Sequence, residues 1–410
     1  MNTKWSALIF AFIITAVMYI PYIGYSIGAI DIIEEFSISY ASVGLLATST
    51  AIVGGLMLPY AGFLTDKLGP KKIILFGLGT LVIGQLLFGI ATSFTILIVA
   101  RVIVGIGVAI LLIAPYTLVI HWFEDSKSTG LGLGIMIGTD GIGSLLATYV
   151  FAITFTLLGW RINALISSIV LLSVLTITWK SLKDSNTFKP NREVKFKLES
   201  VLELLKERNV IAGAIYLTGL FSVFNLAVFW IPTILMEEKN WSEGLSGFIG
   251  STFALAGILG SFIFGAYSDK LKKRKVFIMV ANLGMLIAFV GFSYFYSIGN
   301  YVALAILLPI AGFFGYGGPA VTYSLTAESI DKSKVGLANG LVLGIGMLIG
   351  GSIVPVLVGY LKDLFGEYTI GFLIIGGYLL IFSILNILLL KDVNEIQIVQ
   401  SKEMNLTDQL

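Results

Sequence analysis

The chain is dominated by long apolar runs, without the short alternation of apolar and polar positions that water-soluble helices and strands show. A helix that crosses a lipid bilayer needs about 20 largely apolar residues. Enough apolar length is present for twelve such helices, and the longest polar stretch, residues 181–209, divides them six and six. The predicted spans are residues 6–28, 41–64, 73–92, 95–120, 130–157, 161–180, 210–235, 244–267, 275–297, 299–326, 335–361 and 369–390.

This spacing predicts an all-α integral membrane protein with four parts. They are an N-terminal six-helix bundle over 1–180, a cytoplasmic linker over 181–209, a C-terminal six-helix bundle over 210–395 and a cytoplasmic tail over 396–410. The first apolar run is longer than the 7–15-residue core of a cleaved signal peptide. We therefore expect it to be the first membrane helix.

Composition explains why the surface faces lipid. Hydrophobic residues make up 57% of the 410 residues and charged residues only 12%, whereas soluble domains carry roughly 25% charged residues. There is no cysteine and one histidine, His121, which excludes thiolate sites and multi-histidine metal sites. Because His121 falls at the predicted membrane interface, we expect no His-Asp-Ser constellation. No phosphate-cradling glycine loop is present either. We expect a protein that is not an enzyme and that has no cofactor and no nucleic-acid partner.

The basic residues lie almost entirely on one side of the predicted spans. With the N-terminus inside, 22 of the 26 Lys and Arg residues fall on the cytoplasmic side. Only Arg161, Lys239 and Lys362 fall outside, and Arg101 lies within a span. Because cytoplasmic loops are enriched in Lys and Arg, this bias predicts a multi-pass plasma-membrane protein with both termini in the cytoplasm.

The two halves of the chain repeat one another. Residues 62–72, at the end of the second span, match residues 265–275, at the end of the eighth, at an offset of 203. A second glycine series repeats at an offset of 206, with Gly130, Gly134 and Gly138 matching Gly336, Gly340 and Gly344. Repeated halves are typical of carriers whose two bundles rock around a central site.

The first copy of the repeat resembles a known signature. The segment Gly62-x-x-x-Asp66-Lys67-x-Gly69-x-Lys71-Lys72 is similar to the loop between helices two and three of the major facilitator superfamily. Arg101-Val-Ile-Val-Gly105-Ile-Gly107 and Gly159-Trp160-Arg161 are similar to two further features of that family. The resemblance implies twelve helices in two pseudo-symmetric bundles and secondary transport by alternating access.

Some positions depart from the family pattern. Pro70 stands where many members have a basic residue, and Lys272 stands where the first copy has Gly69. Helix five, over Gly138–Gly143, lacks the proline of the family's antiporter motif. We therefore do not assign antiport from sequence.

The resemblance implies a latch at the cytoplasmic ends of the two halves. In the family, helix two packs on helix eleven, and Asp66 would face the positive N-terminal end of that helix. The basic neighbours of Asp66 would pair with carboxylates across the halves, although they could serve only as topology signals. The predicted conformational latch consists of Gly62, Asp66, Lys67, Gly69, Lys71, Lys72, Gly265, Asp269 and Lys270.

Two charged residues, Arg101 and Asp140, fall inside predicted spans away from the span ends, where a charge costs roughly 2.5–3.5 kcal/mol on insertion scales. The resemblance implies that Arg101 contacts an anionic substrate or organises proton coupling. Alternatively, it extends to the outer interface as a snorkelling side chain. Asp140 is a candidate protonation site, a partner for Arg101 or a cation ligand; its alternative is a structural hydrogen bond.

Polar and aromatic residues fall near prolines on helices one, seven and ten, which line the cavity in this family. Proline exposes backbone carbonyls, which lipid cannot satisfy but a cavity can. Helix packing is the alternative for each residue alone. The remaining substrate or coupling candidates are Tyr19, Tyr22, Asn225, Trp230, Tyr316 and Tyr323.

These features favour a monomeric secondary transporter of a small solute, driven by a proton or sodium gradient. Arg101 favours uptake of a small organic or inorganic anion. The aromatic residues favour the alternative, efflux of drugs or metabolites by proton antiport. A solute sensor on a transporter scaffold is the alternative from a different class. The sequence leaves the solute, the coupling ion and the direction open.

Overall fold

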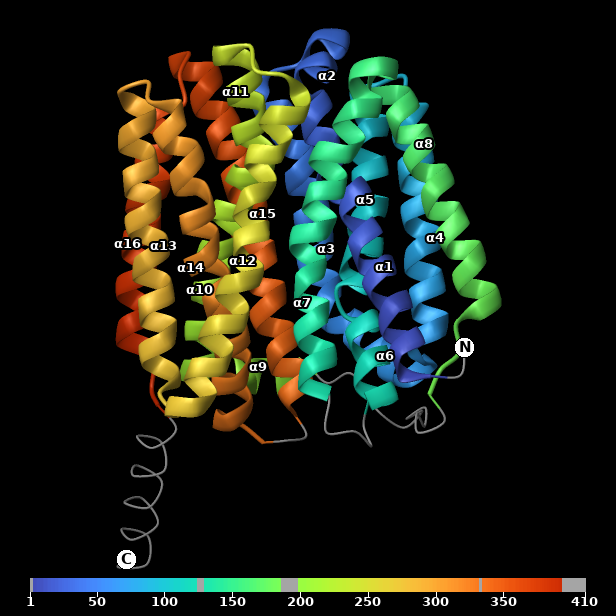
Figure 1. The fold of residues 1–410 in the computed structure, drawn as a ribbon, viewed down its shortest axis with the longest axis vertical. Coiled ribbons are helices and arrows are strands. Elements are labelled where there is room, and N and C mark those ends of the chain that lie inside the picture. The colour runs from blue at the N-terminus through green and yellow to red at the C-terminus, as the bar shows by residue number, and fades with distance from the viewer. Residues whose placement is uncertain (1–2, 124–128, 186–197, 332–333, 393–410) are drawn as a thin grey trace, which may run out of the picture.

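The protein is described by a computed structural model covering residues 3–123, 129–185, 198–331 and 334–392. The regular elements of these residues are helices (Figure 1). The first half contains α1 (Lys4–Ile23), η1 (Gly24–Gly28), α2 (Ala29–Phe36), α3 (Tyr40–Leu68), α4 (Pro70–Gly89), α5 (Phe94–Leu111), α6 (Ala114–Phe123), α7 (Thr129–Leu145), η2 (Leu146–Val150) and α8 (Phe151–Ser181). The second contains α9 (Leu198–Leu204), α10 (Arg208–Asn225), η3 (Leu226–Trp230), α11 (Ile231–Lys239), α12 (Glu243–Leu271), α13 (Arg274–Ser297), α14 (Tyr301–Ser329), α15 (Val335–Phe365) and α16 (Thr369–Leu389).

The described residues contain eleven helical stretches that are long and apolar enough to cross a membrane. One of them, Gly132–Ser181, has 50 residues and would be about 75 Å long, more than twice the ~30 Å of a hydrocarbon core. It breaks at Gly159, whose φ of 76° and ψ of 167° are not helical. Counting this stretch as two crossings gives twelve, so the predicted all-α membrane fold is confirmed.

Two parts of the predicted organisation fall wholly or partly on residues outside the described ranges. These are the middle of the linker, residues 186–197, and the tail, residues 396–410. The end of the linker is described: α9 precedes α10, and Glu203 of α9 forms a 2.6 Å ion pair with Lys334 before α15. This contact raises the pKa of the Lys334 amino group. The boundaries between the four parts remain predictions.

The start of α1 and the end of α16 lie at the same end of the molecule (Figure 1). We call this the inner face, following the charge-based prediction that it is cytoplasmic, and the opposite end, which carries α2 and α11, the outer face. The helices of the first half, blue to green in the figure, lie beside those of the second half, yellow-green to red. The closest packing between the halves joins α3 to α15 and α7 to α12.

Hydrogen bonds join the halves near the outer face. The Ser26 hydroxyl donates to the Val228 carbonyl at 3.0 Å, an acceptor left free because Pro232 has no N–H to offer it. Thr148 donates to the Gly247 carbonyl at 2.9 Å. We call the contacts at this end the outer seam. Its hydrogen-bonding residues are Ser26, Tyr40, Ala41, Thr48, Thr148, Thr156, Val228, Glu243, Gly247, Ser352 and Asp363.

The two halves separate toward the inner face. Near the outer end of α3, a Cβ built on Gly44 would lie 2.5 Å from the Pro355 carbonyl oxygen of α15. Midway, a Cβ on Gly55 would lie 2.7 Å from the Gly344 carbonyl oxygen. At the inner end, a Cβ on Gly62 would have Ile113 of its own half as its nearest neighbour, at 3.9 Å. The described helices therefore close the outer end and diverge at the inner end.

We expect Gly44→Val to open the outer seam. The added side chain would meet the backbone of Pro355, which cannot rotate away, and such overpacking costs typically about 1–3 kcal/mol. The chain has no cysteine, so Ala47→Cys, buried one turn further along α3, provides a single label site. Labelling by a membrane-impermeant maleimide should become roughly tenfold faster. Gly377→Val is the control, because no atom lies within 4 Å of a Cβ built there; equal labelling in both variants would contradict the prediction.

Candidate functional site

The first membrane-crossing helix is interrupted where it passes the candidate site. α1 contains Pro21 and ends at Ile23, and the five residues Gly24–Gly28 continue as a 3-10 helix. Proline removes one N–H from the helical ladder, and a 3-10 segment changes the hydrogen-bonding register. Carbonyl groups around Pro21 therefore need partners from other helices.

Arg101 of α5 supplies these partners. Its Nη2 donates to the Tyr22 carbonyl at 2.6 Å, its Nη1 donates to the Pro21 carbonyl, and its Nε donates to the Leu46 carbonyl of α3 at 3.1 Å. The ring of Tyr25 covers the guanidinium, with its centroid 4.0 Å from Cζ. One side chain thus ties three helices together where α1 is interrupted.

The position of Arg101 bears on its predicted roles. Only 1% of the residue is exposed, whereas a snorkelling side chain would place its charged group in water. No carboxylate among the described residues forms an ion pair with it, so the predicted pairing with Asp140 is not seen. Arg101 is a buried positive charge held by carbonyl dipoles and an aromatic ring. Such a charge is costly without an anion.

Asp140 of α7 lies at the centre of a group of tyrosines. Its carboxylate interacts with the hydroxyl groups of Tyr19 on α1 and Tyr316 on α14. Asp140 is half-buried, and α14 belongs to the other half of the protein. We call this group the central cluster. It consists of Tyr19, Tyr22, Tyr116, Asp140, Tyr316 and Tyr323.

Small residues allow the helices to meet at Asp140. A Cβ built on Gly141 would lie 3.0 Å from the Ala254 carbonyl oxygen of α12. A Cβ on Gly143 would lie 2.8 Å from the Ala16 carbonyl oxygen of α1. Because glycine lets backbones approach closely, α7 packs against both halves, and Asp140 sits where they meet.

The opposite wall of the central cluster is fixed by hydrogen bonds to the part of α14 that precedes Pro319. Pro319 lacks the N–H that would bind the Gly315 carbonyl. The Tyr216 hydroxyl of α10 donates to that carbonyl at 2.7 Å, and the Ser261 hydroxyl of α12 donates to the Tyr316 carbonyl at 2.6 Å. Tyr316 is thereby held facing Asp140.

Two sequence-predicted residues lie away from the central cluster. Trp230 is in the outer seam, where its ring centroid lies 6.3 Å from that of Tyr40 and 5.7 Å from that of Tyr368. Asn225 is buried at the end of α10, and its amide donates to the Phe221 carbonyl at 2.8 Å. The structure thus brings Tyr19, Tyr22, Asp140, Tyr316 and Tyr323 together. Arg101 touches this cluster through the Tyr22 carbonyl, whereas Asn225 and Trp230 lie outside it.

The predicted latch residues are not engaged across the halves. Asp66 is exposed and has no hydrogen bond to α15 among the described residues. The backbone N–H of Lys71 donates to Asp184 of its own half at 2.8 Å. The second copy is also self-contained, because Asp269 pairs with Arg274 at 2.5 Å. Of the others, Gly69 adopts a φ of 96°, Lys67 lies over the Phe63 ring, and Lys72 and Lys270 are exposed. A Cβ built on Gly62 or on Gly265 would meet no atom of the other half within 4 Å.

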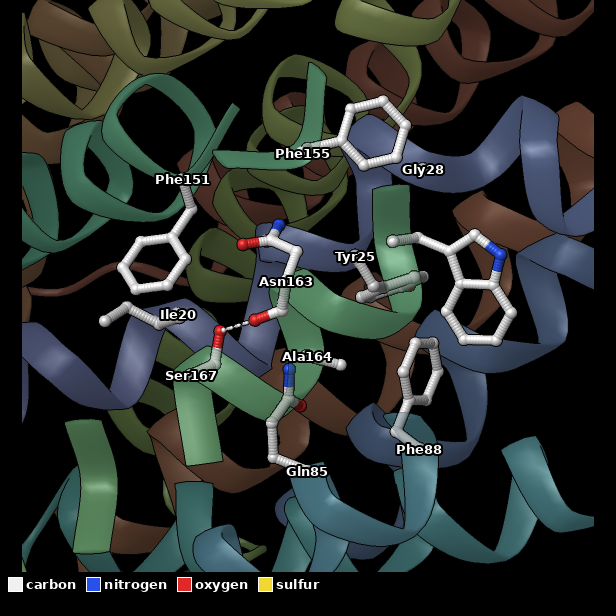
Figure 2. Close-up of a pocket in the computed structure, with 12 residues that line it drawn as sticks. Ile20, Tyr25, Gly28, Gln85, Phe88, Phe151, Phe155, Asn163, Ala164 and Ser167 are labelled. Carbon is white, nitrogen blue, oxygen red and sulfur yellow. Dashed lines mark hydrogen bonds between the residues drawn. The ribbon is translucent and has the colours of Figure 1, made fainter. Parts of the chain in front are cut away.

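A small cavity lies within the first half, beside Tyr25 (Figure 2). The amides of Gln85 and Asn163 and the hydroxyl of Ser167 face it, together with several aromatic rings. Its volume of about 20 Å³ accommodates roughly one water molecule. An organic solute could not fit there, so we do not regard this cavity as the substrate site.

Sequence reasoning missed two residues that the structure places at the site. Tyr25 stacks on Arg101, and the Tyr116 hydroxyl donates to the Met136 carbonyl of α7 at 3.1 Å, one turn before Asp140. Each follows a point where a helix is interrupted, near Pro21 or beside Pro115. That proximity to proline was the available signal.

Comparisons with known proteins agree with this architecture. The family profile described as Major Facilitator Superfamily matches residues 7–245 and 221–404. The "Probable galactarate/D-glucarate transporter GarP" of Escherichia coli is 24% identical, with 97% of each chain covered. The "Probable sulfoacetate transporter SauU" of Cupriavidus necator is 24% identical, with 88% of each covered. A bacterial homologue of the lysosomal transporter Spinster, solved in an inward-facing, unoccupied conformation, matches at a TM-score of 0.78 and 17% identity, over 94% of this chain and 96% of that one.

Proposed function

Because the chain belongs to the Major Facilitator Superfamily, we propose that it takes up a small organic anion together with a proton by alternating access. Members of this family with related sequences are membrane transporters and not enzymes. The observation that carries the proposal is the position of Asp140, a carboxylate in contact with tyrosines of both halves.

Electrostatic repulsion is the reason to expect that a proton is transported with the anion. An ionised Asp140 repels an anionic solute placed beside the tyrosine hydroxyls, since two unit charges 4 Å apart interact by about 4 kcal/mol at an effective dielectric constant of 20. A proton on Asp140 removes that repulsion and turns the carboxyl into a hydrogen-bond donor. Proton and anion therefore promote each other's binding, as thermodynamic linkage requires. They are carried together.

The choice of an anion rests on Arg101 and on the related transporters. The buried guanidinium has no carboxylate partner in the described chain and makes the interior around α1 electropositive. Two relatives covered over nearly their whole length are named for a sugar dicarboxylate and a sulfonated acid. These observations support an organic acid over a cation.

The arrangement of the halves supports one step of the cycle. The outer seam is closed by hydrogen bonds, and the inner latch residues are apart. With the predicted orientation, this is the state that releases solute to the cytoplasm. Closing the inner end would break the outer seam and expose Asp140 to the opposite side.

Uptake by purified protein in liposomes tests the proposal. We expect saturable uptake of radiolabelled galactarate or sulfoacetate that accelerates when the outside is made acidic, with protons entering alongside the solute. Protein-free liposomes and liposomes with a collapsed pH gradient are the controls.

Three outcomes would contradict the proposal. Uptake that depends on sodium and ignores the pH gradient would exclude proton coupling. Export of aromatic cations in exchange for protons would favour efflux. Stabilisation by an acid in a thermal-shift assay with no flux would favour a sensor.

A further inference from the structure

The outer end of α15 repeats the spacing of the predicted inner latch. Residues Gly359-x-x-x-Asp363-x-x-Gly366 have the same separations as Gly62-x-x-x-Asp66-x-x-Gly69. Each pattern ends a long helix: Gly69 caps α3 and Gly366 caps α15, with φ of 96° and 76°. The two helices are the pair that packs most closely across the halves. They present the pattern at opposite faces of the membrane.

Asp363 binds the start of the partner helix. One carboxylate oxygen accepts from the Tyr40 N–H at 2.9 Å, and the other accepts from the Ala41 N–H at 2.8 Å. These are the first two residues of α3, whose N–H groups have no partner within the helix. A negative charge there is also favoured by the helix dipole. The carboxylate therefore satisfies two donors and crosses from one half to the other.

Gly359 makes this approach possible. A Cβ built on it would lie 2.8 Å from the Ala41 nitrogen and still closer to the Tyr40 carbonyl. Both neighbours are backbone atoms of α3, which cannot move without shifting the helix. Gly359 thus occupies in this pattern the position that Gly62 occupies in the predicted inner latch, and its missing side chain lets the two helices approach closely.

The surrounding side chains support the contact. Lys362 pairs with Glu237 of α11 at 2.9 Å, and the Tyr368 hydroxyl donates to Glu237 at 2.8 Å. Burial, together with Glu237, raises the pKa of Tyr368, which keeps its hydroxyl protonated as a donor. The rings of Tyr368 and Trp230 pack against Tyr40. The start of α3 is held on several sides.

We propose that residues 359–366 form an outer latch that stabilises the state closed at the outer face, as the reversed counterpart of the inner latch. At each face, the C-terminal end of one helix of the α3–α15 pair carries an aspartate to the N-terminal end of the other. Only one latch engages at a time, because the pair separates at one face when it closes at the other. The inference rests on the alternating access proposed above.

Distance measurements between spin labels test it without any knowledge of the solute. The chain has no cysteine, so pairs of introduced cysteines need no altered background. Leu68→Cys with Leu271→Cys reports on the inner face, and Glu34→Cys with Ile298→Cys on the outer face. All four positions are exposed, and none is a latch residue.

Asp363→Asn should shift the population toward the state open at the outer face. Asparagine keeps the size of the side chain but loses the charge and one acceptor oxygen. Loss of a capping carboxylate of this kind should change the ratio of the outward-open to the outward-closed state roughly fivefold. Asp66→Asn should shift the ratio in the opposite direction. The double variant should return close to the original ratio. Glu367→Gln, four residues beyond Asp363, changes a carboxylate that accepts from Thr369 of its own half and should leave the ratio unchanged.

The possible results distinguish a failure of the outer latch from a failure of the proposed alternating access. If two states are populated but Asp363→Asn leaves their ratio unchanged, or shifts it in the same direction as Asp66→Asn, the outer latch is wrong. If neither label pair shows a second distance at any pH or in any variant, alternating access itself fails. Gel filtration of each variant identifies any that does not fold, and the opposite shift of Asp66→Asn remains as a measurement independent of Asp363.

Discussion

Asp140→Asn is expected to abolish accumulation of the solute while leaving its exchange across the membrane intact. A pH difference of one unit is worth about 1.4 kcal/mol per proton, so one proton per anion supports about tenfold accumulation. Asparagine can still accept hydrogen bonds from Tyr19 and Tyr316 but cannot carry a proton. The accumulation ratio in liposomes should therefore fall from about ten to about one, whereas exchange of labelled for unlabelled solute continues.

The control for this experiment is a carboxylate far from the central cluster. Glu34→Gln removes an exposed carboxylate of α2 and should leave both accumulation and exchange unchanged. Accumulation by Asp140→Asn at the original ratio would show that another group carries the proton. Loss of both accumulation and exchange would show that Asp140 serves the fold or the solute and not the coupling.

Arg101→Met is expected to destabilise the protein and to stop transport. Arg101 holds the buried carbonyls of Pro21 and Tyr22, and an unsatisfied buried polar group costs about 1–3 kcal/mol. The Leu46 carbonyl keeps the Thr50 hydroxyl as a partner. The free energy of unfolding should therefore fall by at least about 2 kcal/mol. Uptake should fall by more than about tenfold, because the interrupted part of α1 also positions Tyr19 and Tyr22. Thermal unfolding and liposome uptake measure the two effects.

Two further variants show whether charge or geometry is responsible. Arg101→Lys retains the charge, but an ammonium lacks the planar fork that reaches several acceptors at once; we expect intermediate stability and weak uptake. Arg208→Met removes an exposed arginine that donates to the Leu388 carbonyl at 2.9 Å, a contact that water can replace, so the loss should stay within about 1 kcal/mol. If Arg101→Met is as stable as Arg208→Met, Arg101 does not hold α1 in place.

The fold was largely predictable, because lipid imposes a simple requirement on sequence. Each crossing must be a long apolar helix, and each of the twelve predicted spans corresponds to a helical segment. The loop motif between α3 and α4 identified the family. Hydropathy could not predict the interruptions inside the spans, such as the 3-10 segment Gly24–Gly28, because the apolar pattern continues through them.

The site was predictable in its residue types but not in its contacts. Asp140 and its tyrosines stand out because polar groups are scarce in the spans. The sequence could not show that Arg101 turns toward the carbonyls of α1 and not toward Asp140. Every residue has a backbone carbonyl, so the sequence does not mark which carbonyls accept hydrogen bonds from a side chain. The role of Asp363 is hidden for another reason. Its pattern does not fall at the internal repeat offset near 203, because it links α3 to α15 in the reverse sense across the membrane.

The lengths of α3 and α15 determine which surroundings these aspartates experience. With 29 and 31 residues, the two helices extend about 44–47 Å, through the hydrocarbon and both headgroup layers. Asp66 and Asp363 therefore sit at headgroup depth on opposite faces, within reach of dissolved ions and lipid phosphates. Ionic strength weakens exposed charge interactions, so salt on one side should act on one aspartate only. The electrolyte on each side of the membrane thus becomes a separate control on which way the carrier faces.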